Sequence, residues 1–425
     1  MESTYLVGGA VRDQLLDRPV KDLDYVVVGS TPATMLAKGF RQVGSDFPVF
    51  LHPTTSDEYA LARTEAKDGV GYQGFNCDFS PKITLKQDML RRDLTINAMA
   101  INPETGDVVD YYGGQQDLAD RKLRHVSEAF SEDPLRVLRV ARFAARYTDL
   151  GFTVASETMA LMSELAASGE LSNLTAERVW QETEAALCTD QPSVYFEVLR
   201  ECGALKVLFP EIDALYGVPQ TAIYHPEIDT FLHTMLVLTR AAELSNDPAV
   251  RFAALCHDLG KAVTPEAMLP SHHGHELKGA DLVRPLSKRY KVPKHMSDLA
   301  YLAAKHHTQS HVALVSGHKA HMRLFKDTDA FRRPERFKKL LLVFEADAQG
   351  RTTFERAHYY QAVVLEAELQ SALEVTAVDF VNQGFTGKLL GIQIERERLR
   401  AIKKARHTSS YSGLRDVLLT PHMQR

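Results

Sequence analysis

The sequence is poor in cysteine and has no long apolar run. Its 425 residues include four cysteines, none in a Cys-x-x-Cys pair: Cys77, Cys188, Cys202 and Cys256. This scatter argues against a disulfide framework and against a cysteine-based zinc site, and it fits a reducing cytosol. No stretch approaches the roughly eighteen apolar residues of a membrane span. The first eleven residues lack a basic segment followed by an apolar one. We therefore expect a cytoplasmic protein without a secretory signal and without membrane contact.

A surplus of positive charge is also missing, because 55 acidic residues outnumber 50 lysines and arginines. An RNA partner would need a local basic surface, since phosphate contacts supply much of the affinity. Three stretches offer one: Lys288–Lys294, Arg332–Lys339 and Arg396–Arg406. Each is equally well explained as a solvated helix face. Charge alone therefore does not indicate a nucleic-acid partner, and the apolar fraction of 44% indicates only an ordinary globular protein.

Two regions of different pattern divide the chain. Up to about residue 125, short β-rich runs separated by turn residues predict strands: Tyr5–Val7, Tyr25–Val28, Val49–Leu51 and Tyr59–Arg63. Helical stretches, for example Thr31–Lys38, lie between them. From about Asp133, apolar residues at helical spacing predict helices and no further strand: Leu135–Tyr147, Ser156–Ala167, Ala176–Ala186, Ser193–Cys202 and Leu232–Leu244. The predicted class is α+β, with an α/β head at residues 1–140 and helical domains at 141–225, 226–330 and 331–425.

The head carries a glycine turn followed by two carboxylates. Gly8 and Gly9 separate a predicted strand from a predicted helix, so their backbone can approach a phosphate closely, and Arg12 can add a charge-assisted contact. Asp22 and Asp24 alternate along a strand and so face the same way. Paired carboxylates of this kind hold Mg²⁺ in phosphoryl-transfer sites. Each element alone is common, but together at this spacing they predict a catalytic magnesium site.

These motifs resemble the DNA polymerase β-like nucleotidyltransferases, and more narrowly the class II family of CCA-adding enzymes and bacterial poly(A) polymerases. Further motifs follow in the family's order: Arg91-Arg92-Asp93-Leu94-Thr95-Ile96-Asn97-Ala98, Asp110-Tyr111-Tyr112-Gly113-Gly114 and Glu132-Asp133-Pro134-Leu135-Arg136. Tyr111 replaces the proline of the family's Asp-Pro-Phe-Gly-Gly turn. The resemblance implies a polymerase-β-like head that transfers nucleotides to the 3′ end of tRNA.

A helix rich in arginine follows the last of these motifs. Asp133 and Pro134 form a good helix start, and Arg136, Arg139 and Arg142 follow at intervals of three. A basic solvated face is the simpler interpretation. However, cytosine and adenine both present an amino donor beside a ring-nitrogen acceptor, so an aspartate acceptor and an arginine donor would select them against uracil and guanine. The resemblance implies such a choice of CTP and ATP by Asp133 and Arg136. It also implies that Arg92, Arg139 and Arg142 hold the triphosphate or the base.

The segment Arg63–Tyr72 combines glycines with charges and predicts a mobile loop. In the resembling family a flexible loop at this place is associated with the switch from C to A addition. Its presence therefore favours full CCA addition over CC addition alone.

Histidines cluster in the second half of the chain, where twelve of the 17 lie between His225 and His321. The centre of the cluster is His257-Asp258, with His233 about one helix earlier. Imidazole and carboxylate ligands suit a borderline divalent metal such as Ni²⁺, Mn²⁺, Zn²⁺ or Co²⁺. The segment resembles the HD superfamily of metal-dependent phosphohydrolases, which implies His233, His257 and Asp258 as ligands. Candidates for further ligands are Asp347, whose place in the sequence is remote, His273 and His306.

The two resemblances together match the HD-containing CCA-adding enzymes of γ-proteobacteria. They imply stepwise CMP and AMP addition to tRNA, with Mg²⁺ in the head and a transition metal, Ni²⁺ for preference, in a phosphohydrolase domain acting on 2′,3′-cyclic phosphates or 2′-nucleotides. Three alternatives stay open: a poly(A) polymerase, an HD phosphohydrolase with an inactive head, and a non-catalytic tRNA-binding scaffold. The oligomeric state, monomer or homodimer, is not indicated.

Overall fold

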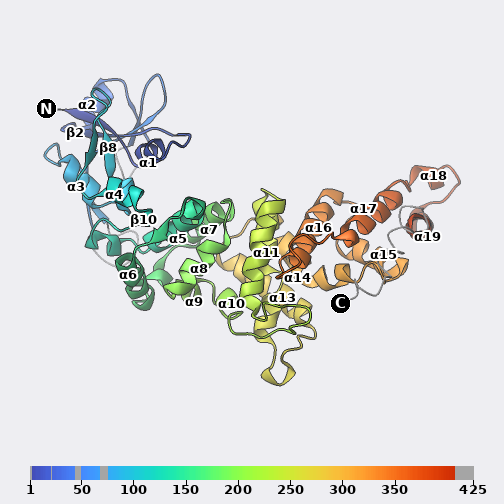
Figure 1. The fold of residues 1–425 in the computed structure, drawn as a ribbon. Helices are drawn as coiled ribbons and strands as arrows, with labels where there is room; N and C mark the ends of the chain where they lie inside the picture. The colour runs from blue at the N-terminus through green and yellow to red at the C-terminus, as the bar shows by residue number, and fades with distance from the viewer. Residues whose placement is uncertain (1, 21, 44–48, 68–74, 407–425) are drawn as a thin grey trace. The chain divides into compact units, whose positions relative to one another are not determined.

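The chain folds into two compact units in a computed structural model that describes residues 2–20, 22–43, 49–67 and 75–406 (Figure 1). The first unit consists of residues 1–186 and 194–208, and the second of residues 187–193 and 209–425. The main sheet lies in the first unit, and the second unit is helical. This arrangement confirms the predicted α+β class.

The first unit begins with strands and short helices and ends in helices. Its strands are β1 Ser3–Val7, β2 Asp24–Val28, β3 Arg41–Val43, β4 Val49–Leu51, β5 Glu58–Leu61, β6 Thr64–Lys67, β7 Phe75–Asp78, β8 Met99–Ile101, β9 Val108–Asp110, β10 Lys122–Leu123 and β11 Thr153–Val154. Its helices are α1 Gly9–Leu15, α2 Pro32–Ala37, α3 Leu85–Leu90, α4 Gly114–Ala119, α5 Leu135–Tyr147, α6 Ser156–Ala167, α7 Ala176–Leu187, α8 Ser193–Glu201 and α9 Ala204–Leu208.

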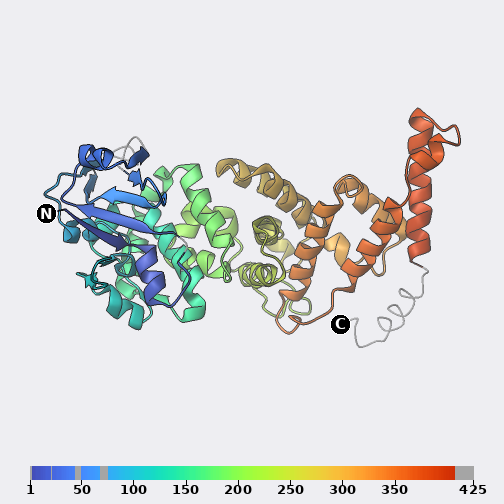
Figure 2. The ribbon, with the colours of Figure 1, turned by 90° about the horizontal axis from the view of Figure 1, so that it is seen from above.

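Seven strands form the main sheet, in the order β3-β4-β5-β2-β1-β8-β9 (Figure 2). Strand β2 pairs antiparallel with β1 and parallel with β5. Because successive strand residues face opposite sides, β2 contributes Val26 to one apolar cluster and Val27 to another. Both faces of the sheet are therefore covered, and the paired starts of β2 and β5 bring their first side chains together at one edge.

The sequence predicted the bounds of some elements of this unit and missed others. The bounds of β4, α5 and α6 are confirmed without change. The prediction that no strand follows Asp133 is wrong, because β11 pairs with β10 in a two-stranded parallel sheet. Two residues are too few to produce an alternating pattern in the sequence. The predicted loop Arg63–Tyr72 is wrong at its start, where β6 pairs with β7, and its residues 68–72 lie outside the described residues.

The second unit is a bundle of helices. Its members are α10 Pro210–Asp213, α11 Thr230–Leu244, α12 Pro248–Cys256, α13 His275–Arg289, α14 Lys294–His311, α15 His318–Asp327, α16 Pro334–Gln349, α17 Tyr360–Leu373, α18 Val378–Val381 and α19 Gly387–Ala405. Helices α11, α12, α14 and α16 pack against one another, and α13 packs on α14. Across the described ranges, we find no helix with the length and apolar composition needed to cross a bilayer.

Candidate active sites

A cleft of about 610 Å³ opens in the first unit where β1 ends. Gly8 links β1 to α1 with a φ of 70°, a backbone conformation that residues other than glycine rarely adopt. Gly8 and Gly9 both line the cleft, as the predicted phosphate turn requires. Arg12 also lines it but is almost fully buried. Its Nε donates to Asp13 at 2.9 Å and its Nη1 donates to Asn97 at 2.5 Å, so this guanidinium is fixed beneath the turn.

The acidic edge of the cleft lies at the start of β2. Asp24 is the first residue of this strand and pairs in register with Glu58 of β5, and both line the cleft. Burial raises the pKa of Asp24, the charges of Glu58 and Asp22 raise it further, and Arg92 opposes them. Such gathered negative charge favours a bound cation, and carboxylate oxygens suit Mg²⁺.

The predicted partner of Asp24 lies just before the strand. Asp22 is exposed and precedes β2, so the prediction that both aspartates alternate within one strand is wrong. The sequence reasoning also missed Glu58. An acid at the start of a second β-rich run was the available signal, but only the parallel register of β2 and β5 makes it a neighbour of Asp24.

The lining of the cleft is also rich in arginine, and acids from several elements bind these side chains. Arg92 donates to Asp88 at 3.2 Å, Arg139 Nη2 lies 2.7 Å from Asp93, and Arg142 donates to Glu182 at 2.6 Å. The arginines that line the cleft are Arg12, Arg63, Arg91, Arg92, Arg136, Arg139, Arg142, Arg146 and Arg178. A site of this charge suits a polyanion such as a nucleoside triphosphate.

Asp93 accepts hydrogen bonds from several groups around this cleft, a role that the sequence did not reveal. Its carboxylate accepts from Arg139 Nε at 2.8 Å, from Asn97 Nδ2 at 2.9 Å and from the backbone N–H of Leu94 at 2.8 Å. Burial alone would raise the pKa of Asp93, but Arg139 and the hydrogen bonds outweigh it and hold this pKa well below its usual range. The Arg-Arg-Asp motif thus links the sheet to α5 through a charged, buried acceptor.

The arginines of α5 do not form the solvated face that the simpler interpretation predicted. Arg136 is buried, and its Nη1 and Nη2 donate to the backbone carbonyls of Ala129 at 2.7 Å and Arg91 at 2.6 Å. Asp133 caps the start of the helix by accepting from the N–H of Leu135 at 3.1 Å. Its other oxygen accepts from Arg178 of α7 at 2.8 Å. Asp133 is therefore held by Arg178, which the sequence did not single out, because α7 lies more than forty positions farther along the chain.

The turn after β9 is built by Asp110. Its carboxylate accepts from the backbone N–H groups of Tyr112, Gly114 and Gln115 at 3.1, 3.0 and 2.9 Å. Tyr111, which replaces the family's proline, is 45% exposed. The side chain of Asp110 orders this turn, so the proline can be lost without loss of the turn.

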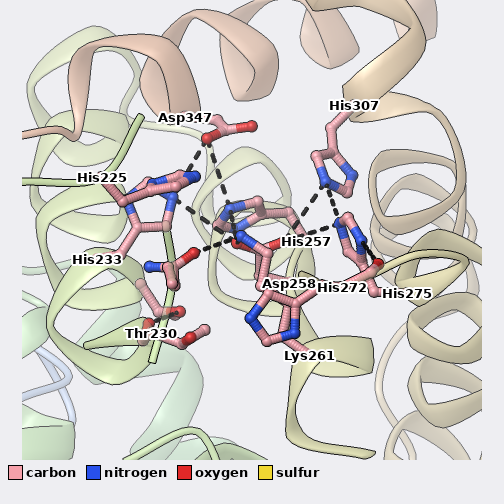
Figure 3. Close-up of polar contacts among 12 residues, drawn as sticks. His225, Thr230, His233, His257, Asp258, Lys261, His272, His275, His307 and Asp347 are labelled. Carbon is pink, nitrogen blue, oxygen red and sulfur yellow. Dashed lines mark hydrogen bonds and ion pairs between the residues drawn. The ribbon is translucent and has the colours of Figure 1, made fainter. Parts of the chain in front are cut away.

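A second site lies in the helical unit, where four side chains converge in the interior (Figure 3). His233 comes from α11, His257 and Asp258 follow α12, and Asp347 comes from α16. His233 Nε2 lies 3.3 Å from Asp347 Oδ1, and His257 Nε2 lies 3.2 Å from Asp258 Oδ2. All four are at most 2% exposed. The structure thus brings together the predicted ligands and also Asp347, whose remote place in the sequence had left it in doubt.

Hydrogen bonding leaves the two imidazoles ready to bind a metal. His257 Nδ1 donates to the carbonyl of Ala254 at 2.7 Å, and His233 Nδ1 lies 2.9 Å from Glu227 Oε1. The neutral His257 ring therefore carries a lone pair on Nε2. Neither His257 Nε2 nor either ring nitrogen of His233 has a hydrogen-bond partner among the described residues. Burial alone would raise the pKa of Asp258, but Lys261 and His257 hold it well below its usual range. Buried unpaired nitrogens beside ionised carboxylates fit a divalent transition metal.

Two of the other predicted ligands point elsewhere. His273 is exposed, and His306 pairs through Nδ1 with Gln309 at 3.1 Å. Their sequence neighbours His275 and His307 are buried beside Asp258 instead. The sequence located these histidine pairs, but only the helix orientation decides which member of each pair faces the interior.

Comparison with known proteins identifies the domains of this chain and its relatives. Family models match residues 4–124 (Poly A polymerase head domain), 151–216 (Probable RNA and SrmB- binding site of polymerase A) and 230–348 (HD domain). The Multifunctional CCA protein of Hahella chejuensis is 56% identical over 420 residues, covering 98% of this chain and 99% of that protein. The Multifunctional CCA protein of Pasteurella multocida is 58% identical over 407 residues, covering 95% and 97%.

The chain belongs to the multifunctional CCA protein family. It is therefore an enzyme, a tRNA nucleotidyltransferase that adds CCA, and its HD domain supports phosphohydrolase activity. Both activities depend on divalent metals.

Solved structures agree on the fold. A CCA-adding enzyme in its apo form II has a TM-score of 0.64 at 19% identity, covering 98% of this chain and 91% of that one. A CCA-adding enzyme of Thermotoga maritima complexed with tRNA has a TM-score of 0.59 at 20% identity, covering 95% and 90%.

Proposed function

We propose that the cleft of the first unit transfers CMP, CMP and AMP in turn from CTP and ATP to the 3′ hydroxyl of a tRNA. The observation that carries this proposal is the pairing of Asp24 with Glu58 in a cleft that is also lined by arginines. Solved CCA-adding enzymes of this fold bind ATP, CTP and tRNA, which supports these as partners of this chain.

In this proposal Asp22 and Asp24 hold Mg²⁺, and Glu58 adds negative charge beside them. Bound Mg²⁺ supplies Lewis-acid stabilisation of the reacting phosphate. The 3′ oxygen of the tRNA bonds to the α-phosphorus while the bond from that phosphorus to the oxygen bridging to the β-phosphate breaks, and pyrophosphate leaves. Gly9 and Arg12 approach the triphosphate from the turn. Arg92, Arg139 and Arg142 hold its charge, each already oriented by a buried acid.

In this proposal Asp133 and Arg136 select the base of the incoming nucleotide. Asp133 accepts from the exocyclic amino group that cytosine and adenine share, and Arg136 donates to the ring nitrogen beside it. Arg178 keeps Asp133 oriented through the 2.8 Å contact. Uracil and guanine present acceptors and donors in the reverse order, so they meet like groups at both positions.

The buried site of the helical unit lies within the matched HD domain and is called the HD site below. We propose that it hydrolyses 2′,3′-cyclic phosphates and 2′-nucleotides and acts as a phosphatase. His233, His257, Asp258 and Asp347 hold a transition metal, for which Ni²⁺ is the proposed identity. Such RNA ends arise by cleavage, so one chain would clean a damaged tRNA end and then rebuild it. A cytoplasmic location, the oligomeric state and domain boundaries at residues 140, 225 and 330 remain predictions.

The decisive experiment offers tRNA lacking its 3′ CCA to the full chain with each nucleoside triphosphate separately and with CTP and ATP together. We expect C addition from CTP, A addition only after it, and no use of UTP or GTP. Long A tails without C incorporation would instead support a poly(A) polymerase. We expect Asp24→Ala to abolish addition, whereas Asp107→Ala, at an exposed aspartate of the same unit, should leave it unchanged. Full addition by Asp24→Ala would show that addition does not depend on this carboxylate and that the proposed site does not transfer the nucleotides.

Hydrolysis is tested on a 2′,3′-cyclic phosphate with His257→Ala. We expect this variant to lose hydrolysis and to retain nucleotide addition. Equal loss of both activities would show that the two sites are not separate. Absence of both activities from the unaltered chain would leave a tRNA-binding scaffold.

A further inference from the structure

A cleft of about 310 Å³ opens on the surface of the helical unit beside the HD site. Lys261 and His275 line this cleft and also reach the buried carboxylate of Asp258. Lys261 Nζ lies 2.6 Å from Asp258 Oδ2, and His275 Nε2 lies 3.4 Å from Asp258 Oδ1. Figure 3 shows His275 on the opposite side of Asp258 from His233. The cleft is therefore a surface approach to the HD site.

The lining of the cleft includes a buried amide whose nitrogen has no partner. Gln220 lines the cleft and is 3% exposed, and its Oε1 accepts from Lys261 Nζ at 2.5 Å. An ammonium group can only donate, so the amide oxygen must face Lys261 and the amide nitrogen must point away from it. Gln220 Nε2 has no hydrogen-bond partner among the described residues. A buried donor beside a cation favours an anionic ligand rich in oxygen, such as a phosphate.

The same loop presents an aromatic ring to the cleft. Tyr224 lines the cleft and is 63% exposed. Its backbone N–H donates to the carbonyl of Thr221 at 3.0 Å, so the chain turns here, and the N–H of Gln220 donates to the carbonyl of Ile228 at 2.8 Å and closes the loop. An exposed ring on such a turn offers a flat face on which a nucleobase can stack.

The size of the cleft limits what it can hold. Small-molecule pockets measure about 300–1,000 Å³, so a cleft of about 310 Å³ lies at the lower end of that range. It suits one terminal nucleotide better than base-paired RNA.

We propose that Gln220 and Tyr224 form the nucleotide-recognition side of the HD cleft. Gln220 Nε2 and Lys261 bind oxygens of the phosphate, and Tyr224 stacks on the base. The proposal rests on the proposed HD function and names its substrate class: nucleotides with a terminal phosphate, in preference to phosphate esters without a base. Every base has a π-face, so stacking accepts all four bases.

The base contact is tested by comparing two substrates of the full chain supplied with Ni²⁺: adenosine 2′-phosphate and glycerol 2-phosphate, which has no base. Preference is the ratio of their kcat/KM values. We expect Tyr224→Leu to lower this ratio roughly 5- to 100-fold and Tyr224→Phe, which keeps the ring, to retain it. The matched control is Tyr216→Leu, at an exposed tyrosine outside the residues that line the cleft. An unchanged ratio in Tyr224→Leu, or an equal fall in Tyr216→Leu, would overturn the base contact.

Gln220→Glu tests the phosphate contact, because glutamate keeps an acceptor for Lys261 and replaces the free donor with an acceptor. We expect kcat/KM to fall at least tenfold for both substrates, with their ratio within about twofold of the unaltered value. Gln370→Glu, at an exposed glutamine of α17, should change neither. Unchanged kcat/KM in Gln220→Glu would overturn the phosphate contact.

Binding separates failure of this inference from failure of the proposed hydrolysis. Adenosine 2′-phosphate is titrated by calorimetry into His257→Ala and into the same variant carrying Tyr224→Leu. Weaker binding in the double variant would support the recognition side even if the unaltered chain hydrolysed neither substrate, a result that would overturn only the proposed hydrolysis. Equal binding by the two variants would overturn the recognition side, and hydrolysis by the unaltered chain would then still stand.

Discussion

Several cations of the nucleotide cleft are fixed by buried acids before any substrate arrives. Asp88 forms ion pairs with Arg91 and Arg92, and Asp93 forms one with Arg139. The nitrogen–oxygen distances of these pairs are 2.7 to 3.2 Å. A preorganised charge of this kind costs little reorganisation when a triphosphate binds. The acids are therefore positioning residues, and changing them should alter nucleotide binding or stability rather than the chemistry at Asp24.

Arg178 gives the sharpest test of base recognition. Arg178→Met removes the contact that holds Asp133, and a hydrogen bond between charged groups contributes about 1.5–3 kcal/mol. We therefore expect KM for CTP and ATP to rise roughly 10- to 100-fold, with measurable incorporation of UTP or GTP. Incorporation assays with each nucleotide measure both effects.

The control for this change is Arg41→Met, at an exposed position of β3, which should leave KM and base choice unchanged. Unaltered kinetics and base choice in Arg178→Met would show that Asp133 does not depend on Arg178. A thermal unfolding midpoint for each variant separates loss of base choice from loss of folded protein.

The lowered pKa of Asp88 makes the stability of the first unit depend on pH. Burial by itself would raise the pKa of Asp88, but Arg91 and Arg92 outweigh burial and lower it. A lowered folded-state pKa stabilises the fold above the unfolded value of about 3.9, and this stabilisation is lost as pH falls through the folded value. Asp88→Asn should therefore destabilise the first unit by about 3 kcal/mol at neutral pH, because two buried guanidinium groups lose a partner.

Thermal unfolding from pH 7 to pH 3 measures this effect. We expect the midpoint of Asp88→Asn to fall less steeply with acid than that of the unaltered chain. Asp107→Asn, at an exposed site, should follow the unaltered curve. Parallel acid curves for Asp88→Asn and the unaltered chain would mean that Asp88 does not carry this pH dependence.

At the scale of elements, both sites depend on contacts between backbones. The parallel pairing of β2 and β5 sets Glu58 beside Asp24, and Asp110 orders the turn that starts α4. In the helical unit, the segment Leu259–Val263 packs on α13. A side chain introduced at such a contact should displace an element and thereby the ligands that it carries.

Gly260→Ala tests this contact. The added methyl group would meet the carbonyl of His275, and overpacking of this kind costs about 1–3 kcal/mol. We expect hydrolysis to fall at least tenfold while CCA addition is retained. Gly391→Ala in α19, where an added Cβ meets nothing within 4 Å, should leave hydrolysis unchanged. Unchanged hydrolysis in Gly260→Ala would show that the position of α13 is not critical.

At the scale of the whole molecule, the two metal-dependent sites lie in different compact units and draw no residue from each other. The proposed ligand types also differ, with carboxylates in the first unit and imidazoles with carboxylates in the second. Hard cations prefer the former and borderline transition metals the latter. The two activities should therefore separate by metal.

Chelation followed by replacement of one metal at a time measures this separation. After treatment with EDTA we expect both activities to be lost. Mg²⁺ alone should restore nucleotide addition, and Ni²⁺ should restore hydrolysis of a 2′,3′-cyclic phosphate. Recovery of both activities to the same extent with Mg²⁺ alone would contradict a transition-metal HD site.

The sequence by itself determined the parts that depend on local order. The Gly8-Gly9 turn, β2 from Tyr25 onward and the bounds of α5 follow from residue types and spacing, and the motif order predicted the family. His257 and Asp258 are adjacent in the chain, so their joint role could also be predicted.

Only the tertiary structure decided which distant side chains complete the sites. Glu58 joins Asp24 through parallel strand pairing, Arg178 joins Asp133 from another helix, and Asp347 joins His233 across the bundle. Helix orientation likewise selects His307 over His306. The physical reason is common to all of these: periodicity fixes which residues share a face of one element, whereas contact between elements depends on how their surfaces pack.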